Sequence, residues 1–221
     1  MKRIDVLRVY ETRLSKVRLG RDHDGGYVVA ILPMPYDHCL SGGIADDNSF
    51  ELAVLDAHPY LTCDAFDPNS DGGPHPHERL RFHRAPVGYL GLHDAREALV
   101  KLDVEGAEWP WLEELSDFTL DNVAQLVVEL HSPHGNLWSW GLLSRLARSH
   151  ALIHAHGNNW DGIVEIDGVK MPGTIETTWV RHDLAQIVGA SHTPIPGPLD
   201  MPNVPTTPDH VIDWPPFCEA L

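Results

Sequence analysis

Residues 98–109 read ALVKLDVEGAEW, and the organisation of the chain can be worked out from them. The apolar run at 99–102 predicts a short buried strand that ends abruptly in an acidic turn containing a glycine. Asp103 opens this turn, so we expect its carboxylate at the carboxyl edge of a parallel sheet, where open α/β folds bind ligands. The alternative is that Asp103, Glu105 and Glu108 only begin a solvated helix, because acidic residues suit a helix N-terminus.

The composition is that of a folded and strongly acidic protein. Of its 221 residues, 43% are apolar and 22% charged, which is typical of a globular chain. Sixteen basic against thirty-two acidic residues give a formal charge of −16, which repels phosphate backbones and anionic lipids. We therefore expect neither nucleic acid nor a membrane as a partner.

The sequence also predicts a cytoplasmic location. No run approaches the roughly 18 apolar residues of a membrane helix, and the charged, amphipathic N-terminus lacks the apolar centre of a signal peptide. The three cysteines have no metal-ligand spacing, so we expect reduced thiols. The fifteen histidines are clustered, which raises a metal or proton-transfer hypothesis beside the simpler one of surface loops.

The N-terminal part predicts a helix and a hairpin. Residues 4–17 carry apolar side chains at roughly helical spacing, as expected of a helix that covers one face of a sheet. An Asp-Gly-Gly turn then separates two short apolar runs, which predicts a β-hairpin. The turn either only joins the two strands, or its residues Arg21, His23 and Asp24 border a ligand.

The stretch 38–51, HCLSGGIADDNSFE, has the layout of a nucleotide-binding strand, glycine turn and helix, with the helix beginning near Asn48 or Ser49. The common GxGxxG pattern is absent. The next strand, at 61–67, ends in an acid about 20 residues beyond the glycines, where a ribose diol is commonly held. We assign that contact to Asp67, with Asp64 as the alternative.

A further buried strand is predicted at 123–131, again with polar residues at its end. Glu129 and His131 are two residues apart and therefore point to the same side of the strand. We expect them beside Asp103, at the ends of neighbouring strands. Asp103, Glu129 and His131 together offer the oxygen and nitrogen ligands that suit Mg, Mn or Fe(II).

The order of elements predicts an α/β fold in a single domain. Strands at 151–159 and 174–181 are joined by a turn-rich loop, so they must pair antiparallel. A mostly parallel sheet with helices on both faces and this C-terminal antiparallel hairpin is the plan of class I S-adenosylmethionine (SAM) methyltransferases, which are Rossmann-like. We divide the domain into three parts: an N-terminal helix and hairpin at 1–36, a core at 37–185 and a proline-rich strap at 186–221. A third strand is expected at 79–88, on the flank of the sheet. The remaining helices are expected at 52–58, 93–98, 111–118 and 141–150.

Several segments resemble FkbM-type SAM-dependent methyltransferases and related methyltransferase-like proteins. They are LVKLDVEGAEW, the DGGYVV hairpin, SGGIADDNSFE, AFDP, ELH, HGNNW and the LDxPNxPxxPD ending at 199–209. The first glycine turn departs from the family's GxNxG form. The resemblance implies that Asp67 holds the SAM ribose, that Asp103 lies beside the sulfonium, and that the SAM tail lies along Ser41, Gly42, Gly43 and Asp46.

We therefore expect a SAM-dependent methyltransferase that acts on a hydroxyl of a small molecule or sugar, with N-methylation as a variant. The base that removes the hydroxyl proton is expected among His131, Glu105 and His156. A divalent metal at Asp103, Glu129 and His131 is a second way to activate the hydroxyl. Two alternatives stay open: a metal-dependent hydrolase that uses the same cluster, and a non-catalytic SAM-binding protein.

Overall fold

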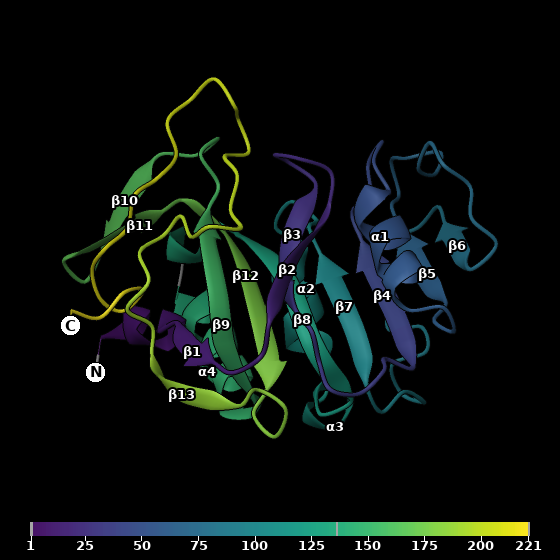
Figure 1. The fold of residues 1–221 in the computed structure, drawn as a ribbon, viewed down its shortest axis with the longest axis horizontal. Coiled ribbons are helices and arrows are strands. Elements are labelled where there is room, and N and C mark those ends of the chain that lie inside the picture. Colours follow the sequence, from purple (N-terminus) through teal and green to yellow (C-terminus); the bar gives the residue numbers. More distant parts are fainter. Residues whose placement is uncertain (1, 136, 221) are drawn as a thin grey trace.

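The structure is a computed structural model that describes residues 2–135 and 137–220, and its centre is a seven-stranded sheet (Figure 1). The strand order is β6-β5-β4-β7-β8-β12-β9, and only β12 runs against the other six. This is the predicted class I methyltransferase plan, including the antiparallel pairing of the last two long strands. The bounds are β4 (His38–Gly42), β5 (Cys63–Phe66), β6 (Leu80–His83), β7 (Ala98–Leu102), β8 (Val123–His131), β9 (His150–Gly157) and β12 (Thr174–Arg181).

Layers on both faces bury the central strands. One face is covered by α1 (Ser49–Ala57) and by the predicted hairpin of β2 (Lys16–Gly20) and β3 (Gly26–Ala30), which crosses the sheet in Figure 1. The other face is covered by α2 (Glu108–Glu114), α4 (Leu137–Ser149) and the short α3 (Asp117–Leu120). Because both faces are covered, every residue of β4 and β7 is buried, which explains the mainly apolar sequence of β7.

The predicted helix at 4–17 is wrong. A 3-10 helix, η1 (Arg3–Leu7), buries Ile4 and Leu7, and the chain then forms β1 (Tyr10–Thr12) before it enters β2. β1 pairs with β13 (Ile187–Ala190), about 180 residues away in the sequence, so a long-range contact overrides the local helical spacing. The helix expected at 93–98 is also not formed: this segment consists of turns, and β7 begins at Ala98.

The loop between the last two long strands contains a small hairpin that the sequence analysis did not predict. Its strands are β10 (Ile163–Ile166) and β11 (Val169–Pro172). The two residues between them, Asp167 and Gly168, both have positive φ, as a two-residue hairpin turn requires. The signal was present in the sequence, since Asp-Gly between apolar runs favours this turn.

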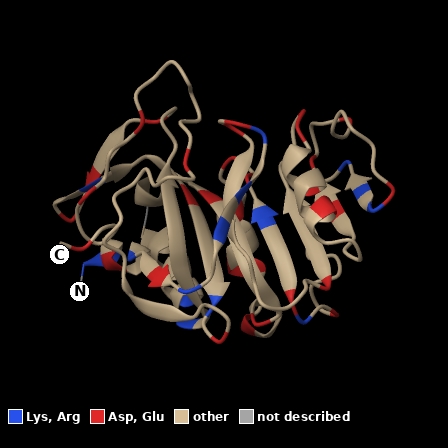
Figure 2. Cartoon of the chain, in the orientation of Figure 1, with Lys and Arg blue, Asp and Glu red and all other residues tan. Residues whose placement is uncertain are grey.

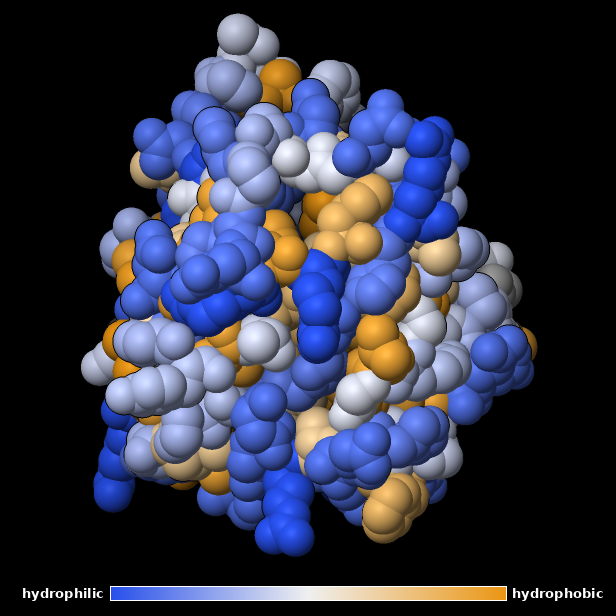
Figure 3. Space-filling model, turned by 90° about the vertical axis from the view of Figure 1, so that its right-hand side faces the viewer, coloured by the Kyte–Doolittle hydropathy of each residue, from blue (hydrophilic) through white to orange (hydrophobic). Residues whose placement is uncertain are grey.

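The C-terminal segment lies across the β9 and β12 side of the molecule as an extended strap (Figure 1). Ile195 and Ile212 form an isolated antiparallel bridge that closes the neck of a long loop, drawn in yellow at the top of Figure 1. Phe217 is fully buried, and the indole Nε1 of Trp214 donates to the carbonyl of Lys170. None of the described helices has the length and apolar character needed to cross a bilayer. On the β6 side of the molecule, apolar residues are scattered among hydrophilic ones (Figure 3).

Candidate active site

A cavity of about 760 Å³ opens at the carboxyl edge of the sheet. Its volume is within the range of small-molecule and cofactor sites. One end is lined mainly by apolar residues and the other by polar and acidic ones. The first group is Ala45, Phe66, Pro68, Pro86 and Val87, and the second includes Asp24, Asp103, Glu129, His131, Asn158 and Asp161. In Figure 2 acidic residues occur along this upper edge.

The cavity brings together six of the predicted site residues: Gly43, Asp67, Asp103, Glu105, Glu129 and His131. Four others do not line it: Ser41, Gly42, Asp46 and His156. Ser41 points away from the cavity, since its hydroxyl donates to the buried carboxylate of Glu51 on α1 at 2.5 Å. Asp46 is exposed on the loop before α1. Of the hairpin residues considered as ligand neighbours, only Asp24 lines the cavity, while the His23 ring contacts the carbonyl of Pro202 on the strap.

The glycine turn is held against the end of β7. Gly43 has a φ of +76°, and a Cβ on it would lie 1.6 Å from the carbonyl oxygen of Asp103, so no other residue fits there. Beneath the turn, the buried ammonium of Lys101 donates to the carbonyl oxygens of Gly43 at 2.6 Å and Gly42 at 3.4 Å. Lys101 thus fixes the turn from the neighbouring strand.

Asp67 lies immediately after β5, at the predicted second strand end, and organises the loops around it. One carboxylate oxygen accepts from the backbone N–H of Ala45, and the other accepts from those of Asn69 and Ser70. A carboxylate has about four acceptor positions, so one position is left for a ligand. The predicted ribose contact therefore fits the bonding of Asp67.

Asp103 and Glu129 are two acids at neighbouring strand ends that influence each other's pKa. Burial raises the pKa of Asp103, but Lys101, a hydrogen bond from Glu129 and one from the Tyr27 hydroxyl outweigh it, and the net pKa shift is downward. Burial and the charge of Asp103 hold the pKa of Glu129 well above its usual value. The two pKa shifts thus have opposite directions, and Glu129 also accepts from the amide of Asn158 at 2.5 Å.

His131 is oriented by a buried carboxylate. Glu108 is fully buried and accepts from the backbone N–H of His131 at 2.8 Å, and its Oε1 lies 3.2 Å from the ring Nδ1. Nε2 faces the cavity, 3.5 Å from Glu105 and 3.6 Å from Glu129. Burial lowers the pKa of His131, but Glu108, Asp103 and Glu105 raise it, and the net pKa shift is upward. The result is an imidazole whose ring is fixed through Nδ1 and whose Nε2 faces the carboxyl groups of the cavity.

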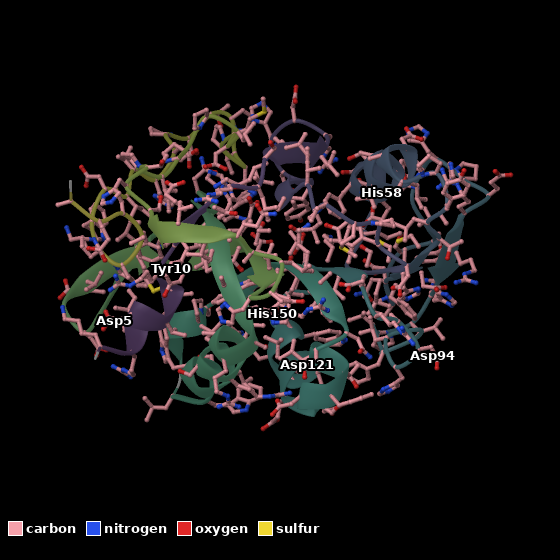
Figure 4. The ribbon with its side chains drawn as sticks, turned by 60° about the horizontal axis from the view of Figure 1, so that its bottom comes forward. Asp5, Tyr10, His58, Asp94, Asp121 and His150 are labelled. Carbon is pink, nitrogen blue, oxygen red and sulfur yellow. The ribbon has the colours of Figure 1, made fainter. Side chains whose placement is uncertain are left out.

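The remaining histidines of the C-terminal cluster have structural partners. His156 is fully buried, with Nδ1 3.1 Å from Glu176 and Nε2 3.0 Å from Asp209 of the strap. His154 pairs with Asp200 of the strap at 2.8 Å. His150 lies at the opposite, amino edge of the sheet (Figure 4), where burial lowers its pKa to about 4. The structure thus separates His156 from His131 and engages both of its ring nitrogens.

The sequence analysis missed Lys101, Tyr27 and the site role of Glu108. Lys101 and Tyr27 stand in apolar strands, where periodicity alone marks them as core residues. Glu108 was considered only as a helix-start acid, yet it is the carboxylate that orients His131. The signal available for it was its place in the DVEGAE turn, five residues after Asp103.

The predicted metal ligands come together at the acidic end. Ligand atoms of Asp103, Glu129 and His131 all lie within 4.8 Å of one another. A carboxylate, a carboxyl group and an imidazole match the oxygen and nitrogen preference of Mg, Mn or Fe(II). These residues therefore fit a divalent metal.

Comparison with known proteins gives structural similarity only. No protein-family model and no curated protein sequence matches the chain. Solved structures similar to this chain include TrmN from Thermus thermophilus, at 16% identity over 66% of this chain and a TM-score of 0.33. The chain spans 44% of the length of TrmN. Human methyltransferase-like protein 13 in complex with SAH matches at 15% identity over 67% of this chain and 72% of its own, with a TM-score of 0.40.

A third structure is a mutant form of the 16S rRNA (adenine(1408)-N(1))-methyltransferase from Catenulisporales acidiphilia. It matches at 14% identity over 77% of this chain and 99% of its own, with a TM-score of 0.35. Similarity at this level concerns the arrangement of strands and helices, and it carries no argument about substrate or site residues.

Proposed function

We propose that this protein is a SAM-dependent methyltransferase of the FkbM type that methylates a hydroxyl group of a small molecule or sugar. The observation that carries the proposal is one cavity that joins Asp67, at the end of the second strand, to the His131–Glu108 dyad at the end of β8. The first feature suits a ribose and the second suits proton removal.

The apolar end of the cavity is the proposed cofactor end. Asp67 would hold the ribose, and Gly43 and Asp103 would lie along the amino acid and sulfonium parts, as the family resemblance implies. Ser41 and Gly42 would not contact SAM directly but would support the glycine turn at Gly43, and Asp46 would flank this turn. SAM, when bound, supplies a methyl group on a positively charged sulfur, which an oxygen nucleophile can displace.

His131 is the proposed proton acceptor. Glu108 fixes the ring through Nδ1, so Nε2 faces the cavity and can take the hydroxyl proton of an acceptor. Glu105 is largely exposed at the mouth and is the weaker candidate, and His156 lies outside the cavity. A positioned base typically contributes about 10²- to 10⁴-fold to the rate.

A divalent metal is the alternative to His131 as the base, since Nε2 of His131 cannot bind a metal and accept a proton at the same time. Asp103, Glu129 and His131 would hold it, and such an ion lowers the pKa of a bound hydroxyl and orients it. The test is the shift in thermal unfolding midpoint when Mn²⁺ is added to chelator-treated protein. A shift that is present in the wild type and absent in Glu129→Gln supports the site, and no shift in the wild type contradicts it.

The charge of the cavity disfavours a nucleic acid acceptor. One of the similar structures is named as a 16S rRNA methyltransferase. Among the residues described here, however, the cavity lining of this chain includes several carboxylates and neither lysine nor arginine. Phosphate binding normally requires those cations. The proposed acceptor is therefore a small molecule.

The experiment that tests the function is transfer of a tritiated methyl group from SAM to a panel of sugars, polyols, phenols and amino alcohols. We expect a methylated product, and a 10²-fold or greater loss of rate in His131→Gln with SAH affinity retained. His192→Gln, an exposed histidine away from the cavity, is the matched control. SAH binding without transfer to any acceptor would favour the non-catalytic binder, and hydrolysis of ester or phosphoester probes without SAH binding would favour the hydrolase.

A further inference from the structure

We infer that the methyl acceptor carries an ammonium group, which Asp24 and Trp160 recognise at the acidic end of the cavity. The inference rests on the proposed function and specifies its substrate class: an alcohol that is also an organic cation, such as an amino alcohol or amino sugar. Three independent features support it.

The first feature is the unbalanced charge of the lining. The cavity presents the carboxyl groups of Asp24, Asp67, Asp103, Glu105, Glu114, Glu129 and Asp161. The nearby Lys101 is buried and donates to the glycine turn, and it already offsets the charge of Asp103 at 3.8 Å. Among the described residues, His131 is the only lining side chain able to carry a positive charge. A cationic ligand is favoured by such a field, and an anionic one is repelled.

The second feature is a buried amide close to Asp24. Asn203 of the strap is 4% exposed, and its Nδ2 donates to Glu176 at 2.7 Å. Asn203 also lies close to Asp24, whose pKa is raised by burial and by the nearby charges of Asp103 and Glu176. The Oδ1 of Asn203 has no hydrogen-bond partner in the described part of the chain. This spot, where the hairpin tip meets the strap, is therefore rich in acceptors and short of donors, and an ammonium group is a donor with three N–H bonds.

Other cations near this spot are already committed. His156 is the cation facing Glu176 from β9, and its two ring nitrogens are taken by Glu176 and Asp209. Arg21 lies 3.7 Å from Asp24, but both side chains are about half exposed, so this ion pair is weak. Asp24 thus keeps a carboxylate available to the cavity.

The third feature is an exposed tryptophan on the cavity wall. Trp160 is 72% exposed although it is a large aromatic residue. Its backbone N–H donates to Asn158 at 2.9 Å, and the preceding Asn159 is buried and bonded to the strap at Val204 and Thr207. The indole is thus presented on a well-held backbone, and the face of an indole attracts organic cations.

The test compares matched acceptors that differ in charge. Each set contains an amine, a neutral alcohol and a carboxylate: glucosamine, glucose and glucuronate in the first set, and ethanolamine, ethylene glycol and glycolate in the second. Every acceptor is offered with tritiated SAM to the wild type and to the variants Asp24→Asn, Trp160→Ala and Asp22→Asn. Asp22 lies on the same hairpin tip, is exposed and does not line the cavity, so it is the matched control. SAH affinity and thermal unfolding are measured for each variant.

We expect transfer to the amine of a set to exceed transfer to its neutral analogue by about tenfold or more, as one hydrogen-bonded charge contact gives. The preference for the amine should be lost in Asp24→Asn and retained in Asp22→Asn. In Trp160→Ala it should be reduced because the KM for the amine rises. SAH affinity should be unchanged in all three variants. Preference for the neutral or anionic members, or a preference for amines that survives in Asp24→Asn, would overturn the inference. Absence of transfer to every amine while SAH still binds would also overturn it and leave the cofactor assignment standing, whereas absence of SAH binding would overturn the proposed function itself.

Discussion

Replacing Lys101 by methionine should strongly destabilise the protein, because this ammonium connects the glycine turn to the end of β7. The side chain is 5% exposed, donates to Gly43 at 2.6 Å and lies 3.8 Å from Asp103. Removing one partner of a buried ion pair costs about 3–5 kcal/mol. Asp103 is 21% exposed, which favours the lower end of that range, but Lys101→Met also leaves the Gly43 carbonyl without its donor. We therefore expect a loss of roughly 3 to 4 kcal/mol.

The measurement is the free energy of unfolding in urea at pH 7 for the wild type and Lys101→Met. Lys170→Met is the matched control, because Lys170 is exposed on β11 and its replacement should change the free energy by less than about 0.5 kcal/mol. A loss below about 1 kcal/mol in Lys101→Met would refute the reasoning, since it would mean that the turn does not depend on this contact.

Three further perturbations test other parts of the structure. Burial lowers the pKa of His156, but its carboxylate partners raise it to about 10 overall. The stability that His156 contributes is therefore complete below about pH 6.5 and is lost toward pH 10. The difference in unfolding free energy between the wild type and His156→Gln, measured by urea titration, should shrink between these two pH values. Gly43→Ala should lower the thermal unfolding midpoint sharply, because its Cβ would lie 1.6 Å from the Asp103 carbonyl oxygen; a midpoint close to that of the wild type would contradict the packing of this turn. Trp179→Ala should cost about 3–5 kcal/mol in urea unfolding, since Trp179 is 1% exposed, whereas the exposed Trp160→Ala should cost little; similar losses in the two would be evidence against this burial.

The sheet was predictable because each of its long strands carries its own signal. Buried apolar runs predict β7 and β8, and the missing helix pattern between β9 and β12 predicts their antiparallel pairing. The N-terminus was not predictable in the same way. Its apolar residues are compatible with helical spacing, and the pairing of β1 with β13 depends on a strand at the other end of the chain.

The site residues that could be predicted are ionisable side chains at the ends of strands. Asp67, Asp103, Glu129 and His131 all follow or close a strand, and the structure brings them to one cavity. Glu108 and Lys101 could not be assigned from spacing, because their roles depend on which backbone group lies above each side chain in the folded molecule. His156 shares the sequence context of a site residue, but its strand directs the ring toward the strap.

The most direct test of the central claim is calorimetric titration of the protein with S-adenosylhomocysteine, repeated on Asp67→Ala and on Asp71→Ala. Asp71 is an exposed acid on the following loop and does not line the cavity, so it is the control. The account predicts micromolar binding to the wild type and to Asp71→Ala, and a loss of about tenfold or more in Asp67→Ala, in a variant that still unfolds cooperatively. Absence of heat with the wild type, or equal affinity in Asp67→Ala, would contradict the assignment of this cavity as a SAM site.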